Sequence, residues 1–158
     1  MRGIPRPLAV IPADRVRRAF AIVAVAALCV LVQAAQAQAD PTAEEWTQIK
    51  RVIAAQREAL VSGDGTRAFS YAAPGIRRYF GDVATFMRMV QQSYSALVEA
   101  RYVEFLEGAV IGGDVVQPLR LVLHDGTVWV ALYGMQRQGD GSWLIASCVI
   151  APSTVRSA

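Results

Sequence analysis

The sequence predicts an α+β fold in which N-terminal helices pack on one face of an antiparallel sheet, a four-stranded meander. Two observations predict this fold. Apolar residues recur at helical spacing between residues 42 and 93, and glycine-containing turns then divide residues 102–150 into segments of strand length. A run of helices followed by a run of strands is typical of α+β domains, whereas parallel sheets alternate the two kinds of element.

Residues 1–39 have the pattern of a cleavable secretory signal peptide. They contain five arginines, an uncharged apolar run of 14 residues at 19–32, and an Ala-Gln-Ala exit at 37–39. A membrane anchor is the alternative, but a spanning helix needs about 20 apolar residues. The pair Arg17-Arg18 leaves both the general and the twin-arginine export routes open. We therefore expect a periplasmic or secreted protein.

Cleavage after residue 39 changes the composition of what remains. Residues 40–158 contain 11 basic and 12 acidic residues, so the surplus of positive charge lies in the leader. A near-neutral chain of 119 residues is long enough for a single domain, and its charge disfavours nucleic acid or a membrane surface as partner. Cys148 is the one cysteine left, which predicts either a buried thiol or a bridge between two chains.

The first helix is expected to begin after Thr42, because Thr42 and Glu45 have the spacing of a capping box. Gly63 suits the left-handed residue that ends a helix. Its apolar residues follow helical spacing: Trp46, Ile49, Val52, Ile53 and Leu60.

Two shorter helices are expected to follow. The second covers about residues 66–72 and stops before Pro74, because a proline disfavours helical geometry in the preceding residue. Residues 74–80 are expected to form one turn or a loop. Asp82 can cap the third helix, which has Phe86 and Val90 on its apolar face.

The strand pairing is predicted from the turns. Gly112-Gly113 and Asp125-Gly126 are treated as two-residue hairpin connections, and residues 139–141 mark the third turn. The resulting register places Val103 opposite Val122, Val122 opposite Trp129, and Tyr133 opposite Cys148.

This register divides the sheet into two faces that are both largely apolar. The first face carries Val103, Phe105, Arg120, Val122, His124, Trp129, Ala131, Tyr133, Met135, Leu144, Ala146, Cys148 and Ile150. The second carries Tyr102, Glu104, Leu106, Leu119, Leu121, Leu123, Val128, Val130, Leu132, Ile145 and Val149. Since the helices can cover one side only, we expect a second copy of the chain on the other side, which makes a homodimer.

Three segments carry a resemblance that covers nearly all of residues 40–158. They are Ala72 to Arg77, Phe86 to Val90, and Trp129 to Trp143. On these residues the chain resembles a family of exported bacterial domains of unknown function. The order of elements also resembles the cone-shaped fold of nuclear transport factor 2 and ketosteroid isomerase. That resemblance implies helices closing over a curved sheet, often around a pocket, but it implies no particular chemistry.

The candidate ligand-pocket residues have aromatic, cationic and thiol side chains: Tyr71, Arg77, Arg120, Trp129, Tyr133 and Cys148. Each has a structural alternative. Tyr133 and Cys148 line a ligand site or form a buried pair. Arg120 binds a carboxylate ligand or pairs with Glu107. Arg77, beside Arg78 and near Tyr71, receives an anion or pairs with an acidic neighbour such as Asp82.

Catalytic signatures are sparse in this sequence. Glu104 is the weak candidate for a catalytic base, since it is the strand carboxylate that is set on an aliphatic face. A lone histidine and the absence of a Cys-x-x-Cys motif predict no metal site, and no cofactor motif is present.

The sequence therefore favours a non-catalytic module that binds a small apolar or amphipathic molecule or another protein. The alternative is a small pocket enzyme of the isomerase or hydrolase kind that uses Glu104 or Tyr133.

Overall fold

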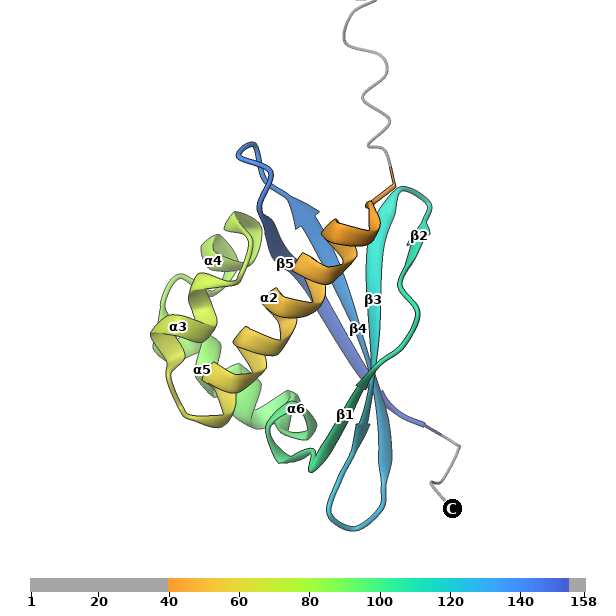
Figure 1. Cartoon of the computed structure of the whole chain (residues 1–158). Helices are drawn as coiled ribbons and strands as arrows, with labels where there is room; N and C mark the ends of the chain where they lie inside the picture. The colour runs from red at the N-terminus through yellow and green to blue at the C-terminus, as the bar shows by residue number, and fades with distance from the viewer. Residues whose placement is uncertain (1–39, 154–158) are drawn as a thin grey trace, which may run out of the picture. The chain divides into compact units, whose positions relative to one another are not determined.

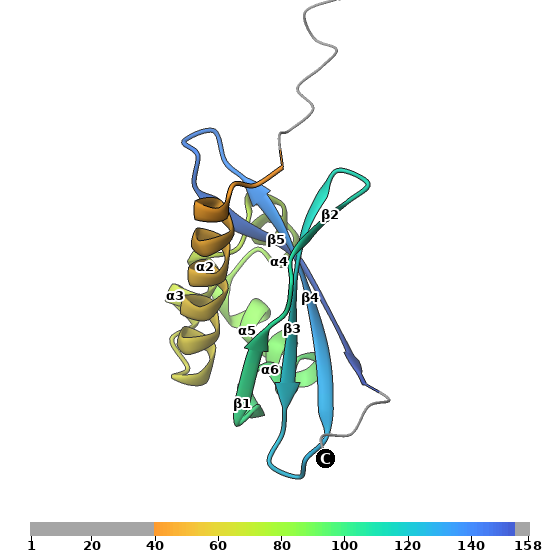
Figure 2. The same cartoon turned by 45° about the vertical axis from the view of Figure 1, so that its right-hand side comes forward.

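Helices and sheet form two layers in the computed structural model of the chain, which describes residues 40–153 (Figure 1). The helices all lie on one face of an antiparallel sheet, and turning the molecule shows that no described helix covers the other face (Figure 2). The predicted α+β class and the placement of the helices on one face of a curved sheet are confirmed. The leader predicted for residues 1–39 lies outside the described residues.

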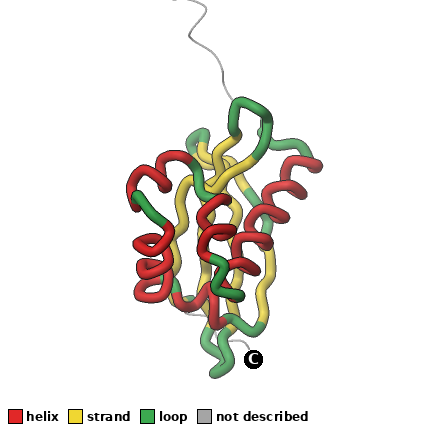
Figure 3. Tube along the Cα trace, turned by 90° about the vertical axis from the view of Figure 1, so that its left-hand side faces the viewer, coloured by secondary structure: helices red, strands yellow, loops and turns green. Residues whose placement is uncertain are grey.

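Five helices make up the helical layer of the described part, which Figure 3 shows in front of the strands. They are α2 (Ala43–Val61), α3 (Gly65–Ser70), α4 (Pro74–Phe80), α5 (Val83–Ser93) and α6 (Ser95–Glu99). Within residues 40–153, none is both long and apolar enough to cross a membrane.

The start of α2 is a complete capping box, as predicted. The Glu45 amide donates to Thr42 Oγ1 at 3.2 Å, and the Thr42 amide donates to Glu45 Oε2 at 2.9 Å. Two amides that the helix cannot satisfy internally thus find partners. At the other end, Gly63 has a φ of 73°, the left-handed conformation expected there.

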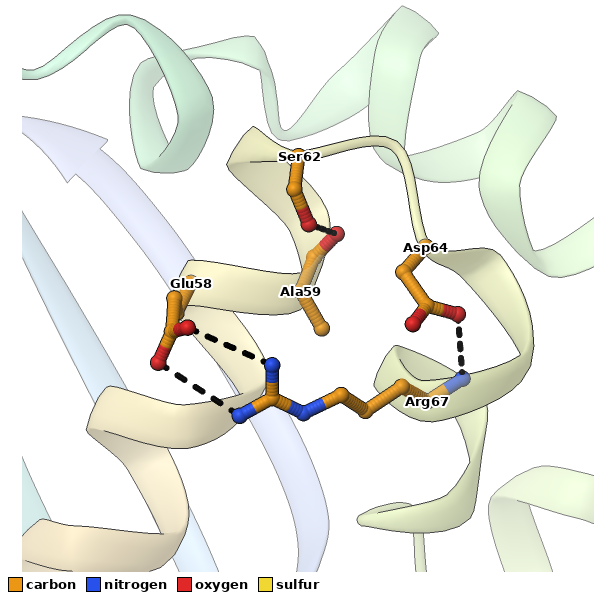
Figure 4. A network of polar contacts seen from close by, with 5 residues as sticks. All are labelled: Glu58, Ala59, Ser62, Asp64 and Arg67. Carbon is orange, nitrogen blue, oxygen red and sulfur yellow. Dashed lines mark hydrogen bonds and ion pairs between the residues drawn. The ribbon is translucent and has the colours of Figure 1, made fainter.

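The connection from α2 to α3 is held by a small polar network (Figure 4). Asp64 caps α3 by accepting the Arg67 amide at 3.0 Å, and Ser62 Oγ donates to the Ala59 carbonyl at 3.1 Å. The Arg67 guanidinium reaches back to Glu58 on α2, with nitrogen–oxygen distances of 3.3 and 3.4 Å. This network fixes the tight reversal between the two helices.

The helices α4 and α6 differ from the prediction, whereas the start of α5 agrees with it. Residues 74–80 form α4 rather than a loop, because Pro74 occupies the first helical turn, where its missing amide costs nothing and its fixed φ is suitable. The short helix α6 was not expected. Asp82 caps α5 as predicted, by accepting the Thr85 amide at 2.8 Å.

The sheet has five strands rather than four. They are β1 (Tyr102–Phe105), β2 (Ala109–Ile111), β3 (Asp114–Val122), β4 (Val128–Arg137) and β5 (Trp143–Pro152). The order across the sheet is β1-β3-β4-β5, and β2 pairs with β3 as well. All of these pairings are antiparallel.

The predicted register between β3 and β4 is wrong by one residue. Leu121, not Val122, lies opposite Trp129. The turn has three residues, 124–126, because the Leu123 amide donates to the Thr127 carbonyl at 2.9 Å. Gly126, with a φ of 82°, supplies the left-handed residue that such a loop requires. Tyr133 lies opposite Cys148, as predicted.

The predicted register between β1 and β3 is also wrong by one residue. The Gly112-Gly113 turn pairs β2 with β3 as expected, with Ile111 opposite Asp114. Residues 106–108 then interrupt the strand, so Tyr102 rather than Val103 lies opposite Val122. The buried Gln117 amide donates to the Leu106 carbonyl at 2.8 Å at this interruption.

Because of these two one-residue differences, the side chains of β3 lie on the opposite face from the one predicted, relative to those of β1 and β4. The inner face, beneath the helices, contains Leu119 and Leu121 together with Tyr133, and all three are fully buried. The outer face contains Arg120 and Glu104, which are direct cross-strand partners. On the outer face Leu132 and Val149 also pair across β4 and β5, with 44% and 60% of their surfaces exposed.

The Trp46 side chain on α2 packs directly over Gly108 in the interruption between β1 and β2. A methyl group at residue 108 would overlap the Trp46 ring carbons. This position therefore requires glycine for its lack of a side chain.

We expect Gly108→Ala to lower the free energy of unfolding by about 1–3 kcal/mol, because the added methyl overpacks the Trp46 contact. Gly139→Ala is the matched control, since nothing lies within 4 Å of the methyl it would add and its φ is not left-handed. Urea unfolding followed by circular dichroism measures both. Equal effects of the two substitutions would contradict the Trp46 explanation.

Candidate functional site

A pocket of about 470 Å³ lies between the helices and one end of the inner face. Its walls come from α2, α4, α5, α6, β4 and β5. The lining residues are Gln56, Leu60, Ile76, Tyr79, Phe80, Phe86, Met89, Val90, Ser93, Tyr94, Leu97, Tyr133, Ile145, Ala146, Ser147 and Cys148.

The pocket follows β5, which is an edge strand of the sheet. At one end the segment before α4 pairs with β5. The Ala73 amide donates to the Ile145 carbonyl at 2.8 Å, and the Ile145 amide donates to the Tyr71 carbonyl at 2.9 Å. Further along the strand, the Tyr94 hydroxyl donates to the Cys148 carbonyl at 2.9 Å. These two attachments hold the helical wall against the strand, and Ala146 and Ser147 line the pocket between them.

Aromatic rings build much of the helical wall. Phe86 packs against Phe69 and Phe80, with ring centroids 5.1 and 5.8 Å apart, and Phe80 in turn meets Tyr79 edge-on. Phe86 is buried, whereas Tyr79 is 83% exposed although it lines the pocket. An exposed aromatic ring on the rim and buried rings inside suit an apolar ligand.

Neutral polar groups lie at the base of the pocket. Tyr133 is fully buried, and its hydroxyl has no nitrogen or oxygen partner among the described residues. Its polar neighbour is the Cys148 thiol, which is a weak hydrogen-bonding group. The Gln56 side chain, which is also buried, donates to the Ala68 carbonyl at 3.3 Å.

Burial keeps these groups protonated. It raises the pKa of the Tyr133 phenol well above its ordinary value, and the neighbouring Cys148 adds to this effect. Burial also raises the pKa of the Cys148 thiol to about 12 and that of the Tyr94 phenol above its ordinary value. At neutral pH all three side chains are therefore uncharged.

The cation that acts electrostatically on Tyr133 is Arg57 of α2. Its Nη2 donates to the Ala100 carbonyl at 2.6 Å, and burial lowers the pKa of its guanidinium. Arg57 favours the ionised form of Tyr133 electrostatically, but the effect of burial on that phenol is larger. Arg57 does not line the pocket.

Of the six predicted pocket residues, Tyr133 and Cys148 line this pocket. Trp129 lies on the same face of β4 as Tyr133, but outside the pocket. Tyr71 is partly buried against the core, and Arg77 is exposed on α4. Neither of them lines the pocket.

Arg120 was placed on the wrong face by the register slip. It lies on the outer face, and its Nη2 is 2.8 Å from Glu104 Oε2. The predicted partner of Arg120, Glu107, is therefore wrong, because the partner in the structure is Glu104. Glu104, the candidate base, occupies this surface ion pair and does not line the pocket.

The helical residues of the pocket were missed by the sequence reasoning. Gln56 carried a usable signal, because it interrupts the apolar stripe of Ile49, Ile53 and Leu60 with a polar side chain. Tyr94 carried none, since its partner is a strand carbonyl 54 residues away.

No cluster of three or more histidine, cysteine or acidic residues within residues 40–153 is arranged to hold a metal ion. The pocket offers thiol, amide and hydroxyl groups, none of which is charged. A metal or an anionic cofactor would therefore find no matching charge among the residues that line it.

The raised pKa of Cys148 predicts slow thiol chemistry. At pH 8 we expect iodoacetamide to alkylate Cys148 in the native protein about a thousandfold more slowly than in the guanidinium-unfolded chain, because only the thiolate reacts. The native rate should rise about tenfold per pH unit until the pH approaches the thiol pKa. Mass spectrometry of the peptide that contains Cys148 measures both rates. Equal native and unfolded rates would contradict the burial of this thiol.

Comparison with known proteins identifies a family but no characterised relative. No curated protein and no solved structure matches the chain, so the resemblance to the fold of nuclear transport factor 2 stays a prediction. A family described as a domain of unknown function (DUF4864) matches residues 42–158, which include every described helix and strand. The match agrees with the predicted resemblance to a domain of unknown function. The chain belongs to the DUF4864 family.

Proposed function

We propose that this domain is a non-catalytic binding module that holds a small apolar or amphipathic molecule in the pocket beside β5. The observation that carries the proposal is a pocket of about 470 Å³ with a mainly apolar wall and a few neutral polar groups at its base. Pockets that bind small molecules commonly have volumes of about 300–1,000 Å³ and this kind of lining. The leader predicted for residues 1–39 would carry the domain out of the cytoplasm.

The enzyme alternative has less support from the site. General acid–base catalysis needs a titratable group within reach of the substrate. No aspartate, glutamate or histidine is among the described residues that line the pocket, and Glu104 is on the outer face. The Tyr133 phenol is held in its protonated form. These features favour binding over proton transfer.

Filling the pocket should weaken binding. We expect purified protein to bind N-phenyl-1-naphthylamine, an uncharged fluorescent probe, with an increase in emission. Ala146 is exposed and lines the pocket, so Ala146→Trp should weaken this binding by about tenfold or more by occupying the space. Fluorescence titration measures the dissociation constants.

Ala54→Trp is the matched control for this experiment, because Ala54 is exposed on α2 and does not line the pocket. It adds the same side chain to the surface and should leave probe binding unchanged. If the wild type does not bind the probe, or if both variants bind like the wild type, the pocket is not a binding site.

We infer that the outer face of the sheet is covered by a second copy of the chain. Leu132 and Val149 form an exposed apolar pair there, and Tyr102 is 53% exposed on the same face. The Glu104–Arg120 pair is neutral as a whole, so two such faces can meet without charge repulsion. An unpartnered apolar sheet face supports a self-complementary contact.

A charge on this face should separate the dimer. We expect light scattering to give the mass of two chains for the wild type and of one chain for Val149→Lys, because a buried unpaired ammonium is costly. Val61→Lys is the control, since Val61 is 52% exposed on α2 in the helical layer. A monomeric wild type, or a dimer that survives Val149→Lys, would contradict the outer-face dimer.

A further inference from the structure

The pocket contains no charged side chain among its described lining residues. This observation limits the ligand more than the size of the pocket does. A charged group that leaves water for an apolar site without a counter-charge loses far more hydration free energy than the site can return. An ionised ligand head group would therefore have to stay in the open mouth of the pocket.

Within this neutral pocket, Tyr133 is the polar group that lacks a suitable partner. Its hydroxyl is fully buried, and no nitrogen or oxygen among the described residues accepts its proton. Buried hydroxyl groups are nearly always paired, and an unpaired one destabilises the fold. An acceptor atom brought by a ligand would remove this cost.

We propose that the ligand is an uncharged, mainly hydrocarbon molecule with one oxygen acceptor, such as a carbonyl, which receives the proton of the Tyr133 hydroxyl. This inference rests on the binding function proposed above and names the chemistry of the ligand. The Tyr133 hydroxyl is shielded from solvent, and the partly buried Cys148 side chain lies beside it. A change of the Cys148 rotamer on binding admits the acceptor, as interface side chains commonly allow.

The competing ligand class is an apolar molecule with a carboxylate, which Arg57 would attract. The structure favours the neutral class. The Arg57 guanidinium does not line the pocket. Its Nη2 donates to the Ala100 carbonyl at 2.6 Å, and although its Nε has no partner among the described residues, that nitrogen is buried outside the pocket lining. A carboxylate at the pocket base would also face the Cys148 thiol and the Gln56 amide, which carry no charge to balance it.

Three probes of one shape separate these classes: 2-acetylnaphthalene, 2-ethylnaphthalene and 2-naphthoate. Equilibrium dialysis at pH 7.5, with detection by naphthalene fluorescence, gives the dissociation constant of each probe for wild type and Tyr133→Phe. We expect Tyr133→Phe to weaken binding of 2-acetylnaphthalene by about three- to tenfold, the usual effect of one hydrogen bond. Binding of 2-ethylnaphthalene should be unchanged, and 2-naphthoate should bind the wild type at least about tenfold more weakly than the ketone.

A measurement on the wild type alone keeps the test independent of how Tyr133→Phe folds. The carbonyl stretch of bound 2-acetylnaphthalene should lie at lower wavenumber than in an alkane solvent, because a hydrogen bond weakens the C=O bond. A stretch at the alkane position would overturn the assignment of Tyr133 as donor.

The remaining outcomes are also decisive. If Tyr133→Phe weakens the binding of 2-acetylnaphthalene and of 2-ethylnaphthalene equally, the hydroxyl only supports the shape of the pocket, and the proposed hydrogen bond is refuted. Tightest binding of 2-naphthoate would overturn the neutral class in favour of Arg57 and an anion. If the wild type binds none of these probes and no N-phenyl-1-naphthylamine, the proposed binding function fails together with this inference. If the wild type binds N-phenyl-1-naphthylamine but Tyr133→Phe does not selectively weaken binding of 2-acetylnaphthalene, the proposed ligand class is refuted and the binding function stands.

Discussion

The burial of the inner face of the sheet beneath the helical layer is the constraint on which the rest of the fold depends. Ile49 and Ile53 of α2 are fully buried in one cluster with Leu119 and Leu121 of β3. Burial of such side chains contributes about 1.5–3 kcal/mol each, so the residues of β3 that face the helical layer are strongly determined. Because side chains alternate along a strand, this choice also determines which residues are left on the outer face.

The pocket arises where this close packing ends. Beside β5, the helical wall is formed by α2, α4, α5 and α6. The segment before α4 attaches this wall to the strand at Ile145, and Tyr94, between α5 and α6, attaches it at Cys148. Between these attachments the wall and the strand are separated by the pocket, and Tyr133 lies where the tightly packed core meets it. A polar group at such a boundary can be completed by a ligand, whereas deeper in the core it would only destabilise the fold.

The chemistry of the two sheet faces depends on a one-residue difference in register. With the pairing expected for a two-residue turn at Asp125-Gly126, Arg120 would share the face of Tyr133, and a cation would lie on the inner face of β3. The three-residue turn places Arg120 on the outer face, where it pairs with Glu104 at 2.8 Å. The same change that keeps Arg120 off the inner face gives the outer face a neutral ion pair, which suits the proposed contact between two copies.

The sequence by itself determined the elements whose signals are local. The capping box of α2, the cap of α5 and the position of each turn follow from neighbouring residues, because the hydrogen bonds concerned span only a few positions. The cross-strand partnership of Tyr133 and Cys148 was also predictable. The tertiary structure alone decided that the turn at Asp125 has three residues rather than two, and that the strand is interrupted at Gly108. The contact of Trp46 with Gly108 joins residues distant in sequence. Such contacts carry no periodic signal in the sequence, whereas the register that accompanies them decides which face of the sheet Arg120 occupies.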